Sequence, residues 1–185
     1  LVGGLCPLLV MTGMHYALGS AQSIQRATVG YATILAPGMV CSNMAQSAAT
    51  FGVALKTKDK ELKSLASTVG VTALCGITEP TLYGIGMKLK RPLYSAMAAG
   101  AIGGLYAGLT GVKQWAYGTS TIFALPVYLG SDNSFINICI AVAISMVLAF
   151  VFSYLTHKDP APASSKAEAA VKPAVLNKKL VIHSP

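Results

Sequence analysis

Long apolar stretches separated by short polar or charged turns set the pattern of this chain. Residues 1–21 and 28–55 are two such stretches, and a polar turn around Gln22, Gln25 and Arg26 separates them. Each stretch is near the roughly 20 residues that a helix needs to cross a bilayer. The pattern therefore predicts two membrane helices joined by a short turn.

Two prolines lie within these stretches. Pro7 and Pro37 each remove a backbone donor, and a proline inside a membrane helix is tolerated only where neighbouring groups satisfy the carbonyls that it frees. Discontinuous helices of this kind are typical of transporter binding sites. The chain is therefore predicted to contain broken helices.

The next apolar stretch, residues 64–87, lies between two basic clusters, at 56–63 and 88–91. If it were a single span, one cluster would face outward, against the preference of Lys and Arg for the cytoplasmic side. At mid-length, residues 76–80 combine a glycine, a proline and Glu79, and such backbone is allowed at membrane depth only where it lines an enclosed or watery cavity. We therefore predict a re-entrant hairpin with Glu79 near its tip and both clusters in the cytoplasm.

The segments after residue 91 predict two more membrane crossings, which bring the chain back to the cytoplasmic side. Residues 93–112 predict an outward crossing whose glycines let helices approach closely. Residues 114–134, interrupted by Pro126, predict an outer loop or a second partial insertion. Residues 135–156 form the most uniformly apolar span and return the chain to the cytoplasmic side. The fold class expected is an all-α integral membrane protein with broken helices and one re-entrant hairpin.

The composition changes after His157, where residues 159–180 are rich in Ala, Lys and Pro. Such a segment predicts a flexible cytoplasmic linker. We expect residues 1–158 to form the substrate-binding part of a transmembrane domain, and residues 181–185 to begin a further domain.

Overall composition agrees with a membrane protein, because 54% of the residues are hydrophobic and 11% are charged. The net charge of +8 could indicate a nucleic-acid partner, but the basic residues lie between the apolar stretches or in the tail, as in cytoplasmic loops of membrane proteins. We therefore expect no nucleic-acid partner. No metal site is expected either, since the cysteines lack zinc-type spacing and are interpreted as small buried apolar residues: Cys6, Cys41, Cys75 and Cys139.

Glu79 is the only carboxylate inside any apolar stretch, and an ionisable group at that depth is costly enough to indicate a function. A carboxylate can accept hydrogen bonds from two hydroxyls at once, and these charge-assisted bonds are strong. Binding of a polyol is therefore the favoured role. Two alternatives remain: an internal ion pair with a basic residue, and a proton site in a cation-coupled carrier.

Three further polar residues could contact a ligand. His15 can donate and accept hydrogen bonds to hydroxyls, although a lone histidine in an apolar stretch could equally bond to a backbone carbonyl. Asn43 and Gln46 are three residues apart and share roughly one face of a helix. They could bind hydroxyls or simply join helices, as polar residues do in membranes.

The sequence Gly-Ile-Thr-Glu-Pro-Thr-Leu-Tyr-Gly at 76–84 resembles the signature of enzyme IIC proteins in the glucose and β-glucoside branch of the phosphotransferase system. Other stretches agree in the same order: Gly13-Met14-His15, Ser42-Asn43-Met44-Ala45-Gln46 and Leu109-Thr110-Gly111-Val112-Lys113. The resemblance covers roughly residues 5–157. Residues 181–185 resemble the first strand of a fused IIA domain.

The resemblance implies a multi-pass, homodimeric permease in the bacterial inner membrane, surrounded by lipid, with its C-terminal tail in the cytoplasm. It implies that His15 and Glu79 bind the sugar, a β-glucoside or related glucoside, and Thr78, Asn43 and Gln46 complete the predicted substrate-binding set. A IIB phosphocysteine would phosphorylate the sugar, supplied by IIA, HPr and enzyme I. The chain would thus be part of a sugar phosphotransferase, without phosphoryl-carrying residues or a cofactor of its own. The alternative is an ion-coupled sugar transporter that uses Glu79 as its proton site.

Overall fold

The computed structural model describes residues 2–33, 35–116, 118–130 and 133–157. The predicted linker at 159–180 and the predicted domain start at 181–185 lie outside these residues, so both stay predictions. Within the described residues the structure consists of helices joined by turns, with one isolated bridge between Ala32 and Gln114. The all-α fold class is therefore confirmed.

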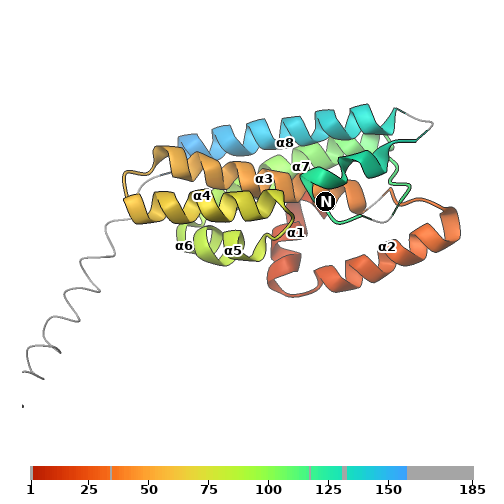
Figure 1. The fold of residues 1–185 in the computed structure, drawn as a ribbon, viewed down its shortest axis with the longest axis horizontal. Helices are drawn as coiled ribbons and strands as arrows, with labels where there is room; N and C mark the ends of the chain where they lie inside the picture. Colours follow the sequence, from red (N-terminus) through yellow and green to blue (C-terminus); the bar gives the residue numbers. More distant parts are fainter. Residues whose placement is uncertain (1, 34, 117, 131–132, 158–185) are drawn as a thin grey trace, which may run out of the picture.

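Four helices form the body of the molecule: α1 (Val2–Met11), α3 (Ala36–Lys56), α7 (Arg91–Leu109) and α8 (Ser134–Thr156). Helices α3, α7 and α8 lie side by side in Figure 1, and α1 runs across them in contact with α3 and α7. Small residues allow the close crossings. A Cβ atom on Gly103 of α7 would coincide with the Ser145 hydroxyl of α8, and one on Gly3 of α1 would lie 2.2 Å from the Gly100 carbonyl oxygen. The glycine-mediated packing predicted for 93–112 is thus present.

Helix α8 confirms the helix predicted at 135–156 and is, within the described part of the chain, the one helix long and apolar enough to cross a membrane alone. Helix α1 is apolar but short. Helix α3 is long but less apolar than α8, because it carries several polar side chains. These side chains are buried among the other helices: Ser42, Asn43, Gln46, Ser47 and Thr50.

The first predicted span was wrong in its boundaries. Helix α1 ends at Met11, and a second helix, α2 (His15–Val29), includes the residues assigned to a polar turn at 22–26. The chain breaks at Gly13, whose φ of +74° suits glycine. Gln and Arg are good helix formers, so the polar residues extend the helix after the break instead of ending it.

Pro37 has a different effect from the one predicted. It lies in the first turn of α3, where its missing N–H would have no partner within the helix. It therefore starts this helix rather than interrupting it. Pro7 lies inside α1, but the helix continues through it from Val2 to Met11, so the break predicted at Pro7 was wrong.

The segment after α3 folds as a helical hairpin (Figure 1). Helix α4 (Lys60–Leu74) begins at Asp59, whose carboxylate accepts a hydrogen bond from the Glu61 N–H at 2.9 Å. The chain then reverses through Gly76, where φ is +87°, and returns along α4. The return arm consists of three short pieces, α5 (Glu79–Thr81), a π-helix (Leu82–Gly86) and α6 (Met87–Leu89).

A side-chain bond links the two arms of this hairpin, since the Thr81 hydroxyl donates to the Val69 carbonyl at 2.7 Å. Glu79 stands at the tip, as predicted. That the hairpin enters the membrane from the cytoplasmic side remains a prediction, because the structure contains no membrane.

The segment 114–134 includes a 3₁₀-helix at Ile122–Tyr128 that packs on α8. Its Tyr128 side chain is fully buried in the main apolar core. The described residues of this segment therefore cover α8, and Ser120 and Thr121 lie beside Gly76 of the hairpin.

Candidate functional site

A cavity of about 480 Å³ lies between α2, the ends of α1 and α3, the hairpin tip and the loop at 118–120. Four of the five predicted site residues line it: His15, Asn43, Thr78 and Glu79. They come from three separate elements, α2, α3 and the hairpin. The fold thus brings together side chains that are up to 64 positions apart in the sequence.

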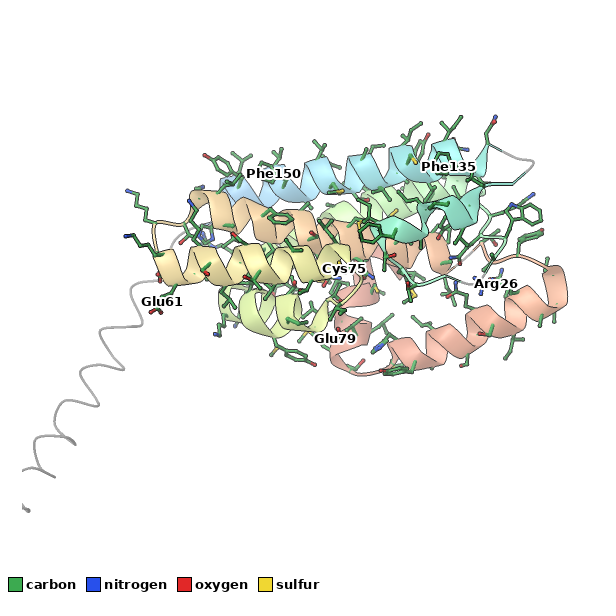
Figure 2. All side chains as sticks on the ribbon, in the orientation of Figure 1. Arg26, Glu61, Cys75, Glu79, Phe135 and Phe150 are labelled. Carbon is green, nitrogen blue, oxygen red and sulfur yellow. The ribbon has the colours of Figure 1, made fainter. Side chains whose placement is uncertain are left out.

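Glu79 is exposed at the hairpin tip, at the start of α5, and Figure 2 shows it facing the beginning of α2. Its carboxylate forms no salt bridge and no side-chain hydrogen bond with any residue that the structure describes. The internal ion pair considered from the sequence is therefore not present in this part of the chain. Both carboxylate oxygens remain available as acceptors toward the cavity.

His15 is the first residue of α2, and its ring centroid lies 4.2 Å from that of Tyr16. Its Nδ1 atom is buried and has no hydrogen-bond partner among the described residues. A buried polar nitrogen without a partner is costly, so a turn of the ring that brings Nδ1 to the cavity would let a ligand supply the missing hydrogen bond.

Asn43 has its orientation fixed by the loop opposite α3. Its Nδ2 donates to the Ser120 carbonyl at 2.9 Å, which leaves the carboxamide oxygen as an acceptor. Thr78 is buried beside Glu79 at the hairpin tip. Carboxylate and carboxamide oxygens together make the cavity rich in acceptors, and a ligand with several hydroxyl donors matches this lining.

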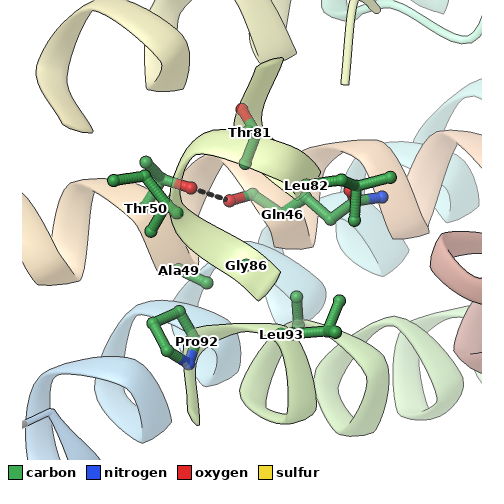
Figure 3. Close-up of a pocket in the computed structure, with 10 residues that line it drawn as sticks. Gln46, Ala49, Thr50, Thr81, Leu82, Gly86, Pro92 and Leu93 are labelled. Atoms are coloured by element: carbon green, nitrogen blue, oxygen red, sulfur yellow. Dashed lines mark hydrogen bonds between the residues drawn. The ribbon is translucent and has the colours of Figure 1, made fainter. Parts of the chain in front are cut away.

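Gln46 lies outside this cavity. It shares a face of α3 with Asn43, but the π-helix of the hairpin covers it, and it lines a separate void of about 10 Å³ (Figure 3). Its side chain is 2% exposed, and its Oε1 has no partner within the described residues. The helical spacing correctly predicted one face, whereas the extent of the hairpin along α3 could not be read from that spacing.

Several cavity residues were not predicted, because α2 was assigned differently from the sequence. On this helix His15, Gly19 and Gln22 follow one another at intervals of four and three and line the cavity together. Residues 118–120 also line it. The helical spacing of polar residues after the Gly13 break is the signal that could have identified this face.

Packed helices with buried polar side chains, a helical hairpin with an acidic tip and an acceptor-lined cavity are the parts expected of a membrane permease domain. Residues 1–101, more than half of the chain, match the family described as phosphotransferase system, EIIC. This chain belongs to that family, so the resemblance carried by the 76–84 motif is confirmed. No solved structure matches the chain.

Similar proteins are components of sugar phosphotransferase systems. The chain is 37% identical over its whole length to the β-glucoside-specific EIIBCA component of Bacillus subtilis strain 168, of which it covers 30%. It is 31% identical over 93% of its length to the arbutin-, cellobiose- and salicin-specific EIIBC component of Escherichia coli K12, and covers 36% of it. It is 32% identical over 83% of its length to the sucrose-specific EIIBC component of B. subtilis, covering 33%. The chain thus spans about a third of these relatives.

Proposed function

We propose that this chain forms the sugar-binding part of a permease that takes up a β-glucoside or related glucoside and presents it for phosphorylation. The observation that carries the proposal is one cavity whose lining includes Glu79, His15 and Asn43. The Asn43 amide is oriented by its hydrogen bond to the Ser120 carbonyl. Family membership and the names of the relatives support the same conclusion.

In this proposal the side chains hold the sugar by its hydroxyls. The Glu79 carboxylate accepts from two adjacent hydroxyls, a type of charge-assisted bond about twice as strong as a neutral one. His15 and Asn43 bind further hydroxyls, and Thr78 orients the hairpin tip beside Glu79. Gln46 is not part of this set, because it lines a different void.

Such a chain contributes to the chemistry by positioning the sugar. Phosphoryl transfer depends mainly on alignment and charge stabilisation, so the cavity has to hold one sugar hydroxyl in line with the phosphorus of a IIB phosphocysteine. The phosphate reaches IIB from IIA, HPr and enzyme I. The fused EIIBCA architecture of relatives supports the IIB and IIA partners. We also propose a homodimer in the bacterial inner membrane, with its tail in the cytoplasm.

The test uses inverted membrane vesicles that contain the complete gene product, IIB and IIA, with HPr and enzyme I added. We expect radiolabelled methyl β-glucoside to be phosphorylated only when phosphoenolpyruvate is present, and at the same rate after an ionophore has dissipated all ion gradients. Sugar movement that requires an ion gradient and yields no sugar phosphate would overturn the proposal. The ion-coupled alternative has no structural observation in its favour.

A further inference from the structure

Helix α2 supplies one wall of the sugar cavity but has no apolar anchor in the described part of the chain. His15, Gly19 and Gln22 line the cavity from this helix, yet none of its side chains is buried. Figure 1 shows α2 extending away from the packed helices of the body. Most helices in proteins are stabilised by burial of an apolar face, so polar contacts have to hold the far end of α2.

Gln114 is the residue of the body on which these polar contacts converge. Its Oε1 accepts a hydrogen bond from the Gln22 Nε2 at 2.9 Å and another from the Arg26 Nη2 at 2.6 Å. Its backbone exchanges two hydrogen bonds, at 3.0 and 2.8 Å, with Ala32, which lies three residues after the end of α2. The far end of α2 is therefore attached to one residue through both its side chains and the backbone that follows it.

Gln114 is itself fixed in the body of the molecule. Its side chain is 1% exposed, and Ala32 beside it is fully buried. Val112, two residues earlier, belongs to the main apolar core. A hydrogen bond from a charged donor such as Arg26 is stronger than a neutral one, and burial strengthens it further. Gln114 therefore provides a rigid and strongly bound point of attachment.

The two side-chain bonds to Gln114 fix the rotation of α2 about its own axis. One face of this helix contains four residues at intervals of four, three and four: His15, Gly19, Gln22 and Arg26. When Gln114 binds the last two, the same face at the start of the helix turns His15 toward the cavity. Arg26 and His15 are about 16 Å apart along the axis, so a small tilt or rotation at Gln114 displaces the imidazole.

We propose that Gln114 is a positioning residue of the sugar site, which sets the rotation of α2 and thereby directs His15 into the cavity. Gln114 is not among the described residues that line the cavity, so it acts through α2 and does not touch the sugar. The inference rests on the proposed function and adds to it a residue about 100 positions away from His15 in the sequence.

The experiment measures the Kd of radiolabelled methyl β-glucoside for the complete gene product and the rate of its phosphoenolpyruvate-dependent phosphorylation at saturating sugar. Gln114→Leu removes the acceptor for α2 but keeps the backbone bonds to Ala32. Gln114→Glu keeps an acceptor oxygen and places a negative charge opposite Arg26. Gln46→Leu is the matched control, because Gln46 is another buried glutamine of the body, and its amide bonds to Ser42 within α3.

We expect Gln114→Leu to raise Kd roughly fivefold or more, because the sugar then binds only the fraction of molecules in which α2 has the correct rotation. The rate at saturating sugar should stay within about twofold of wild type, since bound sugar selects that rotation; a general folding defect would lower this rate instead. Gln114→Glu and the control Gln46→Leu should both keep Kd within about twofold of wild type.

A double-mutant cycle with His15→Ala tests the route of the effect. If Gln114 acts through His15, Gln114→Leu should change Kd by less than about twofold in the His15→Ala background, whereas independent roles would multiply the two effects. Arg26→Leu removes a donor from α2 without altering the body, so it should also raise Kd, and it replaces Gln114→Leu in the cycle if that variant does not fold.

Three results would overturn the positioning role and leave the proposed function intact: multiplied effects in the cycle, an unchanged Kd for Gln114→Leu, or an equal loss of affinity in Gln114→Glu. Failure of wild type to bind methyl β-glucoside would instead overturn the proposed function, and the positioning role with it.

Discussion

Replacement of Glu79 by Gln tests the charge at the hairpin tip with almost no change in shape. The carboxylate has no salt bridge or side-chain hydrogen bond within the described residues, so its removal disturbs no internal contact there. Gln keeps one acceptor oxygen and replaces the other by a donor. At least one charge-assisted bond to a sugar hydroxyl is lost, and such a bond contributes about 1.5–3 kcal/mol. Because 1.4 kcal/mol corresponds to tenfold in affinity, Kd should rise roughly 10- to 150-fold.

The assay is equilibrium binding of radiolabelled methyl β-glucoside to the detergent-solubilised complete protein. Glu61→Gln is the matched control, because Glu61 is an exposed carboxylate at the opposite end of α4, as Figure 2 shows. Its Kd should equal that of wild type, and both variants should have the wild-type melting temperature. An unchanged Kd for Glu79→Gln would refute the reasoning and remove the hairpin tip from the binding site.

Three further outcomes are expected. Gly103→Ala should lower the melting temperature in detergent, because its Cβ would overlap the α8 side of the α7 contact, whereas Gly108→Ala, with open space around it, should not; equal melting temperatures would contradict the packing. Gln46→Leu should keep Kd for the sugar within about twofold of wild type in the same binding assay, since Gln46 lies outside the cavity. A tenfold rise in Kd would show that Gln46 belongs to the binding site. Single cysteines at Lys58 and Lys90 should both react with a membrane-impermeant maleimide only from the cytoplasmic side, and labelling from opposite sides would make the hairpin a full span.

The hairpin was predictable because its signal is local. A glycine and a proline within five residues favour a chain reversal, and the structure has this reversal at Gly76 with Glu79 at the tip. Entry of the hairpin into the membrane stays a prediction. The long helix at 135–156 was predictable for a similar reason, since its residues are almost uniformly apolar.

The course of α2 was not predictable from polarity alone. A run of polar residues between apolar stretches is typical of a turn, yet Gln22 and Arg26 lie in a helix whose polar side faces Gln114. That pairing joins positions 92 and 88 residues apart, so only the tertiary fold shows why these residues stay helical. Gln46 was misplaced for the same reason, because its cover comes from a π-helix about 40 residues later in the chain.

The contact between Gly3 and Gly100 has a consequence for ligand binding at a distance. Backbone touches backbone there, so neither position has room for any side chain, and α1 is pinned to α7 at that point. Only residues 12–14 separate the far end of α1 from His15. The position of the imidazole therefore depends on how α1 packs against α7. We expect a methyl group at Gly100 to push α1 away from α7. A change in helix packing at this junction would then also shift His15.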